Sequence, residues 1–262
     1  MAASDSFIHA AAYDGDVDGL RQALDSGVSP DTKDSKYGFT PLHSLCERRS
    51  VGGELSGDRV ACMNLLIARG ANVNAANGGN VRPLQFAIFN QPGLVPLLLD
   101  AGADPNRASN AGESTLEVER SGLDLVFMED RHRDSRVLKA MVQALVSAGA
   151  EVNPRDDSGR TLLEKYWDLS EDAALKIYPI LFRAGAALPT REHLIPGHTD
   201  RHRGTGTCVA YVRKIRAAGG FKRYERNHLN AITATFAPKL SHLLPPELVR
   251  RVVEYAFHVG DY

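Results

Sequence analysis

Four side chains of the types that bind zinc stand close together late in the chain. His193, His198, His202 and Cys208 lie within sixteen residues, and imidazole nitrogen and thiolate sulfur are common zinc ligands. Zinc sites often place two ligands on one turn through spacings such as CxxC or HExxH, and neither spacing occurs here. The histidines are therefore predicted to be solvated side chains of a basic loop, and no metal is expected.

The run RHRGTGT at 201–207 precedes an expected helix, and Gly-rich turns at helix N-termini can bind phosphate. A Walker motif would continue with GK[ST] after a strand, and a dinucleotide fingerprint would need GxGxxG. The run has neither pattern. We predict a flexible linker and expect no cofactor.

The sequence also lacks a recognisable nucleophilic site. No GxSxG occurs, and Cys46 and Cys62 fall on apolar faces of expected helices rather than beside a base. These observations favour a non-catalytic protein, and we predict that the chain is not an enzyme.

Basic residues gather between 213 and 226, interleaved with Tyr211, Phe221 and Tyr224, a composition found in single-strand nucleic-acid binders. The aromatic residues, however, fall at helical core spacing. Residues 1–190 carry a net charge of −7, whereas residues 191–226 carry +6, and the acidic part would repel nucleic acid. Docking against an acidic partner, or against the acidic residues of the chain itself, is the simpler interpretation, and nucleic acid is not expected.

The composition is that of a folded globular protein. The chain has 262 residues, of which 43% are hydrophobic and 24% charged, with a net charge of −1. No apolar run approaches the roughly 18 residues of a membrane helix, and the N-terminus lacks the pattern of a secretory signal. Three widely spaced cysteines indicate reduced thiols. We expect no membrane association and a cytoplasmic or nuclear location.

One string recurs five times, each time after an apolar amphipathic stretch. Its copies are SGVSPD, RGANVN, AGADPN, AGAEVN and AGAALP, with glycines at 27, 70, 102, 149 and 185. Because glycine adopts the left-handed conformation at low cost, the pattern predicts helices that end at these glycines. A second string, in the forms TPLH, RPLQ, STLE and TLLE, starts at 40, 82, 114 and 161. A Ser or Thr followed by Pro favours a helix start.

Together the two strings resemble the ankyrin repeat. The resemblance implies two antiparallel helices and a protruding hairpin in each unit, and His9 and His43 occupy the position where the imidazole bonds between neighbouring hairpins. Five units are expected, at 5–37, 38–80, 81–112, 113–159 and 160–190, with inserts near 48–58 and 119–135. The predicted fold is all-α apart from short hairpins. It comprises an ankyrin-repeat domain at 1–190, a basic linker at 191–207 and a C-terminal helical segment at 208–262.

The C-terminal segment is expected to form three helices, at 208–218, at 221–236 and from 245 onward. The string LLPPELVRRVVEY at 243–255 resembles the opening of an F-box-like helix, which implies recruitment of a ubiquitin-ligase subunit. The same apolar faces could instead cap the exposed flank of the last repeat, as every open solenoid requires.

The predicted function is non-catalytic protein–protein interaction through the hairpin tips and the concave helix face, as a scaffold or subunit of a larger assembly. The alternative is a substrate-recognition adaptor of a ubiquitin ligase. The acidic repeats predict a protein partner with a basic patch. Candidate partner-binding residues, chosen at the tips, are Lys33, Asp34, Lys36, Tyr37, Phe39, Asn77, Arg107, Asn110, Arg155 and Asp157.

Overall fold

The computed structural model describes residues 3–48, 57–106, 122–128, 134–155, 159–165, 171–189, 205–240 and 242–259. It divides into two compact units, unit 1 at 1–151 and unit 2 at 152–262. The described residues form helices and a single isolated β-bridge, between Arg155 and Thr161. This confirms the prediction of an all-α fold.

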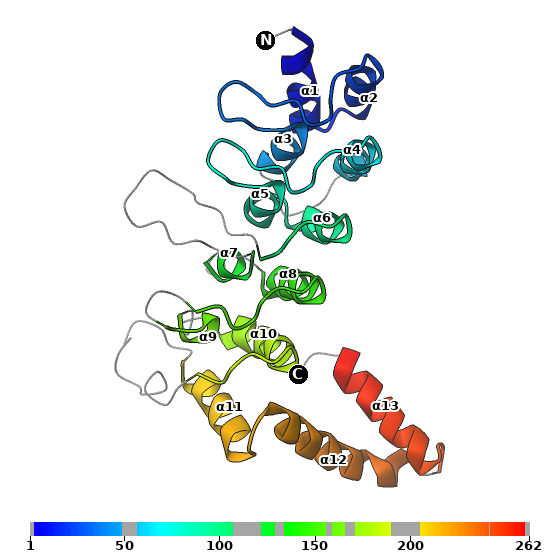
Figure 1. Cartoon of the computed structure of the whole chain (residues 1–262). Helices are drawn as coiled ribbons and strands as arrows, with labels where there is room; N and C mark the ends of the chain where they lie inside the picture. Colours follow the sequence, from blue (N-terminus) through cyan, green and yellow to red (C-terminus); the bar gives the residue numbers. More distant parts are fainter. Residues whose placement is uncertain are drawn as a thin grey trace. The chain divides into compact units, whose positions relative to one another are not determined.

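The described residues of unit 1 form four helix pairs, which lie in two stacked rows (Figure 1). The inner row contains α1 (Ala3–Asp14), α3 (Pro41–Glu47), α5 (Pro83–Asn90) and α7 (Gly122–Met128), and each of these helices contacts the next. The outer row contains α2 (Val17–Asp25), α4 (Gly57–Ala68), α6 (Val95–Asp100), which follows the short 3-10 helix η2 (Pro92–Leu94), and α8 (Ser135–Ser147). The described loops at 26–40 and 69–82, which join the first three pairs, extend beyond the inner row (Figure 1).

Helices α3 and α5 begin where the second string predicts, whereas the copy of that string at 114 lies outside the described residues. Pro41 and Pro83 occupy the first turns of α3 and α5. Thr40 and Arg82 are the N-cap residues of these helices, and each donates its backbone N–H to the side chain three positions later. The N–H of Thr40 donates to His43 Nδ1 at 3.0 Å, and that of Arg82 donates to Gln85 Oε1 at 2.7 Å. Each bond satisfies an N–H group that a helix start would otherwise leave unpaired.

The outer helices end where the first string predicts. The glycines at 27, 70, 102, 149 and 185 all have φ between 83° and 93°. The residue after each glycine donates its N–H to a carbonyl five positions earlier, as Ala103 does to Leu98 at 2.9 Å and Ala150 does to Leu145 at 2.9 Å. This pairing is the Schellman motif. The prediction that these glycines end helices is therefore confirmed.

Asn74, Asn106 and Asn153 lie four positions after the helix-ending glycines at 70, 102 and 149, and we call them the asparagine ladder because each ties its hairpin base to the next. Asn74 donates to the carbonyl of Gly102 at 2.9 Å and accepts from the N–H of Asp104 at 2.9 Å. Asn106 makes the same pair of bonds with Gly149 and Glu151. These contacts hold the repeats of unit 1 in one register, and Asn153 repeats the pattern within unit 2 with Gly185 and Ala187.

Unit 2 contains α9 (Leu162–Lys165), α10 (Glu171–Arg183), α11 (Thr205–Ala217), α12 (Phe221–Leu240) and α13 (Pro246–Val259). The last three correspond to the three helices expected in the C-terminal segment. Both α11 and α12 contact α10, and α12 contacts α13. The α12–α13 contact is built on buried Leu229, Val249 and Val253. Residues 190–204, which include most of the predicted linker, lie outside the described part of the chain.

Candidate protein-recognition surface

The first hairpin tip, at 33–39, is built around the carboxylate of Asp34. Its Oδ1 accepts from the backbone N–H groups of Lys36 at 3.1 Å, Tyr37 at 2.7 Å and Phe39 at 3.3 Å. Partial burial raises the pKa of Asp34, but the backbone hydrogen bonds lower it and leave it below its usual value. Asp34 therefore fixes the conformation of the tip, and its Oδ1 is already used as an acceptor within the loop.

The second tip, at 76–81, is fastened to the first. The backbone N–H of Gly78 donates to the carbonyl of Tyr37 at 2.8 Å, and Lys33 Nζ donates to the carbonyl of Ala76 at 2.9 Å. Asn77 Oδ1 accepts from the backbone N–H groups of Gly79 and Val81 at 3.0 and 2.8 Å. The two tips therefore form one ordered surface rather than two independent loops.

Phe39 lies beneath the tips and is only 7% exposed. Its ring stacks on His43 at 5.5 Å between centroids and meets Phe86 edge-on at 5.0 Å. Phe39 was expected to project toward a partner, but its ring is buried because it packs against the inner-row helices through His43 and Phe86. Phe39 supports the tip from below.

Tyr37 and Lys36 are both exposed on this surface and lie against each other. Tyr37 is 51% exposed, and its ring lies 5.3 Å from that of Phe39 between centroids. Lys36 Nζ lies 4.6 Å from the centroid of the Tyr37 ring, within the range of a cation–π contact. A large aromatic ring on an ordered tip, with a cation beside it, is the composition of an interface anchor.

The remaining candidates are distributed differently. The structure brings Lys33, Asp34, Lys36, Tyr37, Phe39 and Asn77 together at the two tips of unit 1. Arg155 is exposed in unit 2, where its Nη1 donates to the carbonyl of Gly159 at 2.6 Å. Arg107, Asn110 and Asp157 lie outside the described residues.

His43 joins the tips to the helices below them. Its Nε2 bonds to the carbonyl of Val81 at 3.0 Å, and its Nδ1 lies 2.8 Å from Thr40 Oγ1. This confirms the expectation that His43 bridges neighbouring hairpins. Burial lowers the pKa of His43 to about 4, so the ring is neutral at pH 7. His9 bonds differently, through Nδ1 to Ser44 Oγ on α3 at 3.2 Å.

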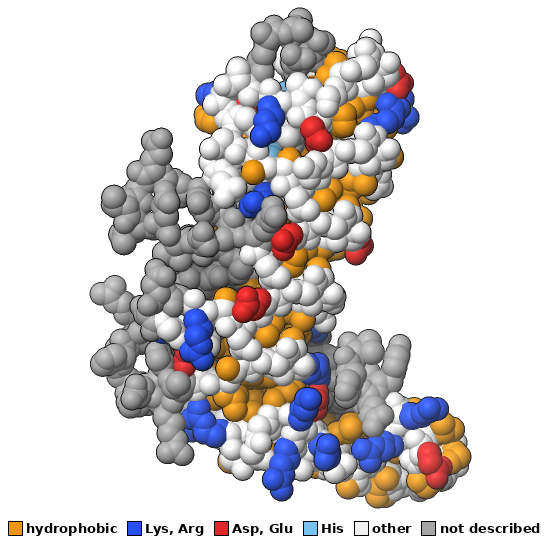
Figure 2. Space-filling view, in the orientation of Figure 1, with side chains coloured by type: hydrophobic (Ala, Val, Ile, Leu, Met, Phe, Trp, Pro, Cys, Tyr) orange, Lys and Arg blue, Asp and Glu red, His pale blue; other side chains and the backbone are white. Residues whose placement is uncertain are grey.

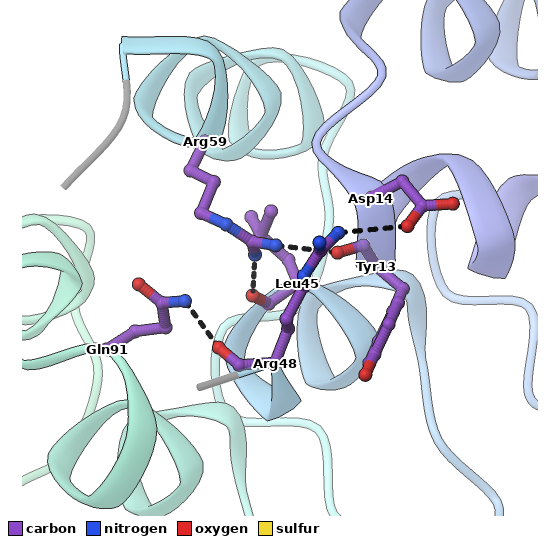
Figure 3. A network of polar contacts seen from close by, with 6 residues as sticks. All are labelled: Tyr13, Asp14, Leu45, Arg48, Arg59 and Gln91. Carbon is purple, nitrogen blue, oxygen red and sulfur yellow. Dashed lines mark hydrogen bonds and ion pairs between the residues drawn. The ribbon is translucent and has the colours of Figure 1, made fainter. Parts of the chain in front are cut away.

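A buried cation that was not predicted lies at the ends of the inner helices opposite the tips (Figure 3). Arg59 on α4 is 7% exposed, and it donates to the carbonyls of Leu45 and Tyr13, each at 2.7 Å. Nearby, Gln91 donates to the carbonyl of Arg48. The signal in the sequence that could have found it is an arginine, Arg59, at a core-facing position of the helix that follows the insert at 48–58.

The thiols described in unit 1 are not arranged for nucleophilic chemistry. Burial raises the pKa of Cys46 to about 12 and that of Cys62 to about 11. A nucleophilic cysteine needs the opposite shift, because the thiolate is the reactive form. Both side chains pack as small apolar groups.

Two further searches cover only the residues that the structure describes. Within them, no three His, Cys, Asp or Glu side chains are grouped so that they could hold a metal ion. His193, His198 and His202 lie outside these residues, as does the side chain of Cys208. Within the same residues, every helix is either too short or too polar to cross a bilayer.

Comparison with known proteins agrees with the repeated geometry. Residues 7–109 match the family model for ankyrin repeats in three copies. The chain is 31% identical over 98 residues to the human BCL-6 corepressor-like protein 1, which covers 37% of this chain and 5% of that protein. It is 28% identical over 215 residues to mouse inversin, covering 80% of this chain and 18% of inversin.

A plant protein is also similar to part of this chain. The chain is 26% identical over 156 residues to the E3 ubiquitin-protein ligase KEG of Arabidopsis thaliana, which covers 57% of this chain and 8% of that protein. The chain therefore spans less than a fifth of the length of each of these three relatives.

Proposed function

Because residues 7–109 are ankyrin repeats, which form a protein–protein interaction module, we propose that the chain binds a protein partner through its first two hairpin tips. Tyr37 is the proposed anchor, and Lys36 adds a cation beside it. The observation that carries the proposal is the half-exposed ring of Tyr37 on a tip that Asp34 fixes through three backbone bonds.

The ordered conformation of the two tips supports this role. Binding normally costs the ordering of interface loops and side chains, and a surface that is already ordered avoids much of that cost. Here the Gly78–Tyr37 and Lys33–Ala76 bonds join the two tips before any partner arrives. The excess of acidic residues over 1–190 favours a partner with a basic patch, since complementary charge speeds association.

We propose that the protein acts as a scaffold or subunit of a larger assembly in the cytoplasm or nucleus, without catalysis of its own. The free, buried thiols of Cys46 and Cys62 suit a reducing compartment. Their raised pKa values give no support to thiol catalysis.

The test places a photo-crosslinking amino acid at position 37 of the full chain in its native cells. The control carries the same group at position 13, because Tyr13 is also exposed, at 41%, but lies at the end of α1 away from the tips. We expect a discrete crosslinked protein from position 37 and not from position 13. The binding constant of that protein should then weaken about tenfold or more in Tyr37→Ala, as for an aromatic interface anchor.

Equal crosslinking from both positions would contradict the proposal, because it would show no preference for the tips. Unchanged affinity of Tyr37→Ala would contradict the anchor role of the ring. Tyr13→Ala serves as the matched loss of an exposed tyrosine and should leave the affinity unchanged.

A ubiquitin-ligase adaptor is the second candidate. The Arabidopsis relative is named a ubiquitin ligase, and α13 leaves Leu248 43% exposed and Val252 46% exposed. Val249 and Val253 on the same helix pack against α12. Because α11 and α12 contact α10, they can cover the last repeat. The exposed apolar strip of α13, formed by Leu248 and Val252, is then left for recruitment of a ligase subunit.

The adaptor role is tested by purifying complexes of the full chain and of Leu248→Glu/Val252→Glu. Ligase subunits should accompany the native chain and disappear from the double variant. Glu247→Ala/Arg251→Ala changes two exposed polar residues of the same helix and should retain them. If the native chain brings down no ligase subunit, the adaptor role is wrong.

A further inference from the structure

Unit 2 carries a group of exposed cations at the junction of α11 and α12. Lys222, Arg223 and Arg226 on α12 are all exposed, and they line an open depression of about 570 Å³ together with Gly219, Gly220 and Phe221. Figure 2 shows Lys and Arg side chains gathered over the part of the surface formed by α11 and α12. We call Lys222, Arg223 and Arg226 the basic patch.

The acidic residues nearby do not neutralise the patch. Glu225 is the only Asp or Glu in the described segment 205–240, and its Oε1 accepts from Arg183 Nε at 2.7 Å. Within the described residues, none of the three patch cations forms an ion pair. Arg213 and Lys214, exposed on α11 before the turn, add two more positive charges.

The patch is unfavourable for folding by itself. Lys222 and Arg223 stand in the first turn of α12, which has no acidic residue. Cations at this end oppose the helix dipole, and like charges so close together repel one another. Such an arrangement is stabilised when an anionic partner lies against it.

From this charge arrangement, we propose that the basic patch is a docking surface for an acidic segment of a protein partner, separate from the tips of unit 1. Arg223 and Arg226 can each bind a carboxylate through two parallel N–H···O bonds, and Lys222 adds a compact charge. The depression gives the acidic side chains room beside the helix. This surface selects a partner of opposite charge to the one proposed for the acidic repeats.

Nucleic acid is a weaker candidate for this surface because the nearby aromatic rings are already paired. Tyr211 packs edge-on against Tyr224 at 5.7 Å between centroids, Phe221 packs on Phe182 at 5.5 Å, and Tyr224 stacks on His228 at 6.0 Å. Single-strand binders use such rings as platforms for bases. A membrane also fits less well, because the large exposed hydrophobic residues described in unit 2 begin only at Phe236.

The test uses the full chain and a fluorescein-labelled peptide of ten glutamates, with binding measured by fluorescence anisotropy at low and at moderate salt. We expect binding that weakens as salt rises. Lys222→Gln/Arg223→Gln/Arg226→Gln should weaken the binding about tenfold or more, because the complementary charges are removed. The control, Arg21→Gln/Arg136→Gln/Arg251→Gln, removes three exposed cations elsewhere and should change binding less than twofold.

Two comparison probes decide the class of partner. A ten-nucleotide oligothymidylate and phosphatidylserine-containing vesicles should each bind more weakly than the glutamate peptide. Tighter binding of either probe, no binding of the peptide, or equal losses in the two triple variants would overturn the proposal. Circular dichroism should show unchanged helix content in both variants, since all six side chains are exposed, and loss of the Tyr37 anchor should leave peptide binding intact.

Discussion

The imidazole of His43 hydrogen-bonds through Nε2 to the carbonyl of Val81, 38 residues later, at 3.0 Å. A carbonyl can only accept, so Nε2 carries the proton and the neutral ring leaves Nδ1 as an acceptor for the backbone N–H of Thr40. Both nitrogens are therefore used, one for the start of α3 and one for the neighbouring hairpin. Protonation would place a proton on Nδ1, where it would face that N–H group.

This arrangement predicts a pH-dependent stability. Burial lowers the pKa of His43 from its ordinary value of 6.5 to about 4 in the folded chain, so between these two pH values the unfolded chain binds more protons. The stability is complete above about pH 7 and is lost as pH falls from about 6.5 toward 4. We expect the free energy of unfolding, measured by urea denaturation, to drop by about 2 kcal/mol between pH 7.5 and 5.

The control is His43→Gln, because Gln85 fills the corresponding position of the next unit and accepts from the N–H of Arg82. This variant should be less stable at pH 7.5 but should lose less stability on acidification. An acid-induced loss of the same size in both proteins would show that His43 is not its source.

The helix-ending glycines give a prediction about backbone strain alone. Gly102 has φ of 90°, and a Cβ built there would meet no atom within 4 Å. Gly102→Ala should therefore lower the free energy of unfolding by about 1–2 kcal/mol, through the left-handed conformation and not through a clash. Thermal unfolding measures this loss.

Gly57 provides the comparison. It begins α4, has no positive φ, and is equally open around its Cα. Gly57→Ala should leave stability unchanged or raise it slightly, because alanine favours the helix. A loss at Gly57 as large as that at Gly102 would contradict the explanation.

The repeated elements could be predicted because their determinants are local. A glycine such as Gly70 ends its helix through its own φ of 83°, and Thr40-Pro41 begins one through its own cap and ring geometry. Neither depends on distant residues. The three C-terminal helices were also evident from apolar spacing, although α12 continues to Leu240, four residues beyond the expected end.

The roles of the tip residues could not be predicted because they depend on contacts between units. Phe39 is covered by Phe86, 47 positions later, and Lys33 donates to Ala76, 43 positions later. Residue type alone suggested that both side chains were free for a partner. The use of Asp34 within its own turn was predictable in principle, since Asp often accepts from the backbone two or three residues onward.

The asparagine ladder leads to a stabilising substitution. Asp31 occupies the ladder position of the first unit and accepts from the N–H of Asn72 at 2.9 Å, as Asn74 does from Asp104. A carboxylate cannot supply the second bond, in which Asn74 donates to the carbonyl of Gly102. Asp31→Asn should therefore raise the free energy of unfolding by about 0.5–1.5 kcal/mol.

The reverse substitution, Asn74→Asp, should lower stability by a similar amount, and urea denaturation of both variants provides the comparison. If Asp31→Asn destabilises the chain instead, the Asp31 carboxylate makes a stabilising contribution beyond the bond to Asn72 that it shares with the ladder asparagines.

Arg59 and Arg48 lie in one network but should differ in their effect on stability (Figure 3). Arg59 is buried and donates to the carbonyls of Leu45 and Tyr13, which close the ends of two inner helices. Its loss removes the donor from the buried carbonyl of Leu45 and from the partly buried carbonyl of Tyr13, so Arg59→Ala should lower the free energy of unfolding by about 2–4 kcal/mol. Arg48 meets Asp14 at 3.0 Å with both side chains about half exposed. Because solvent screens that pair, Arg48→Ala should cost less than about 1 kcal/mol in the same urea titration. Equal losses in the two variants would mean that burial does not set the strength of these contacts.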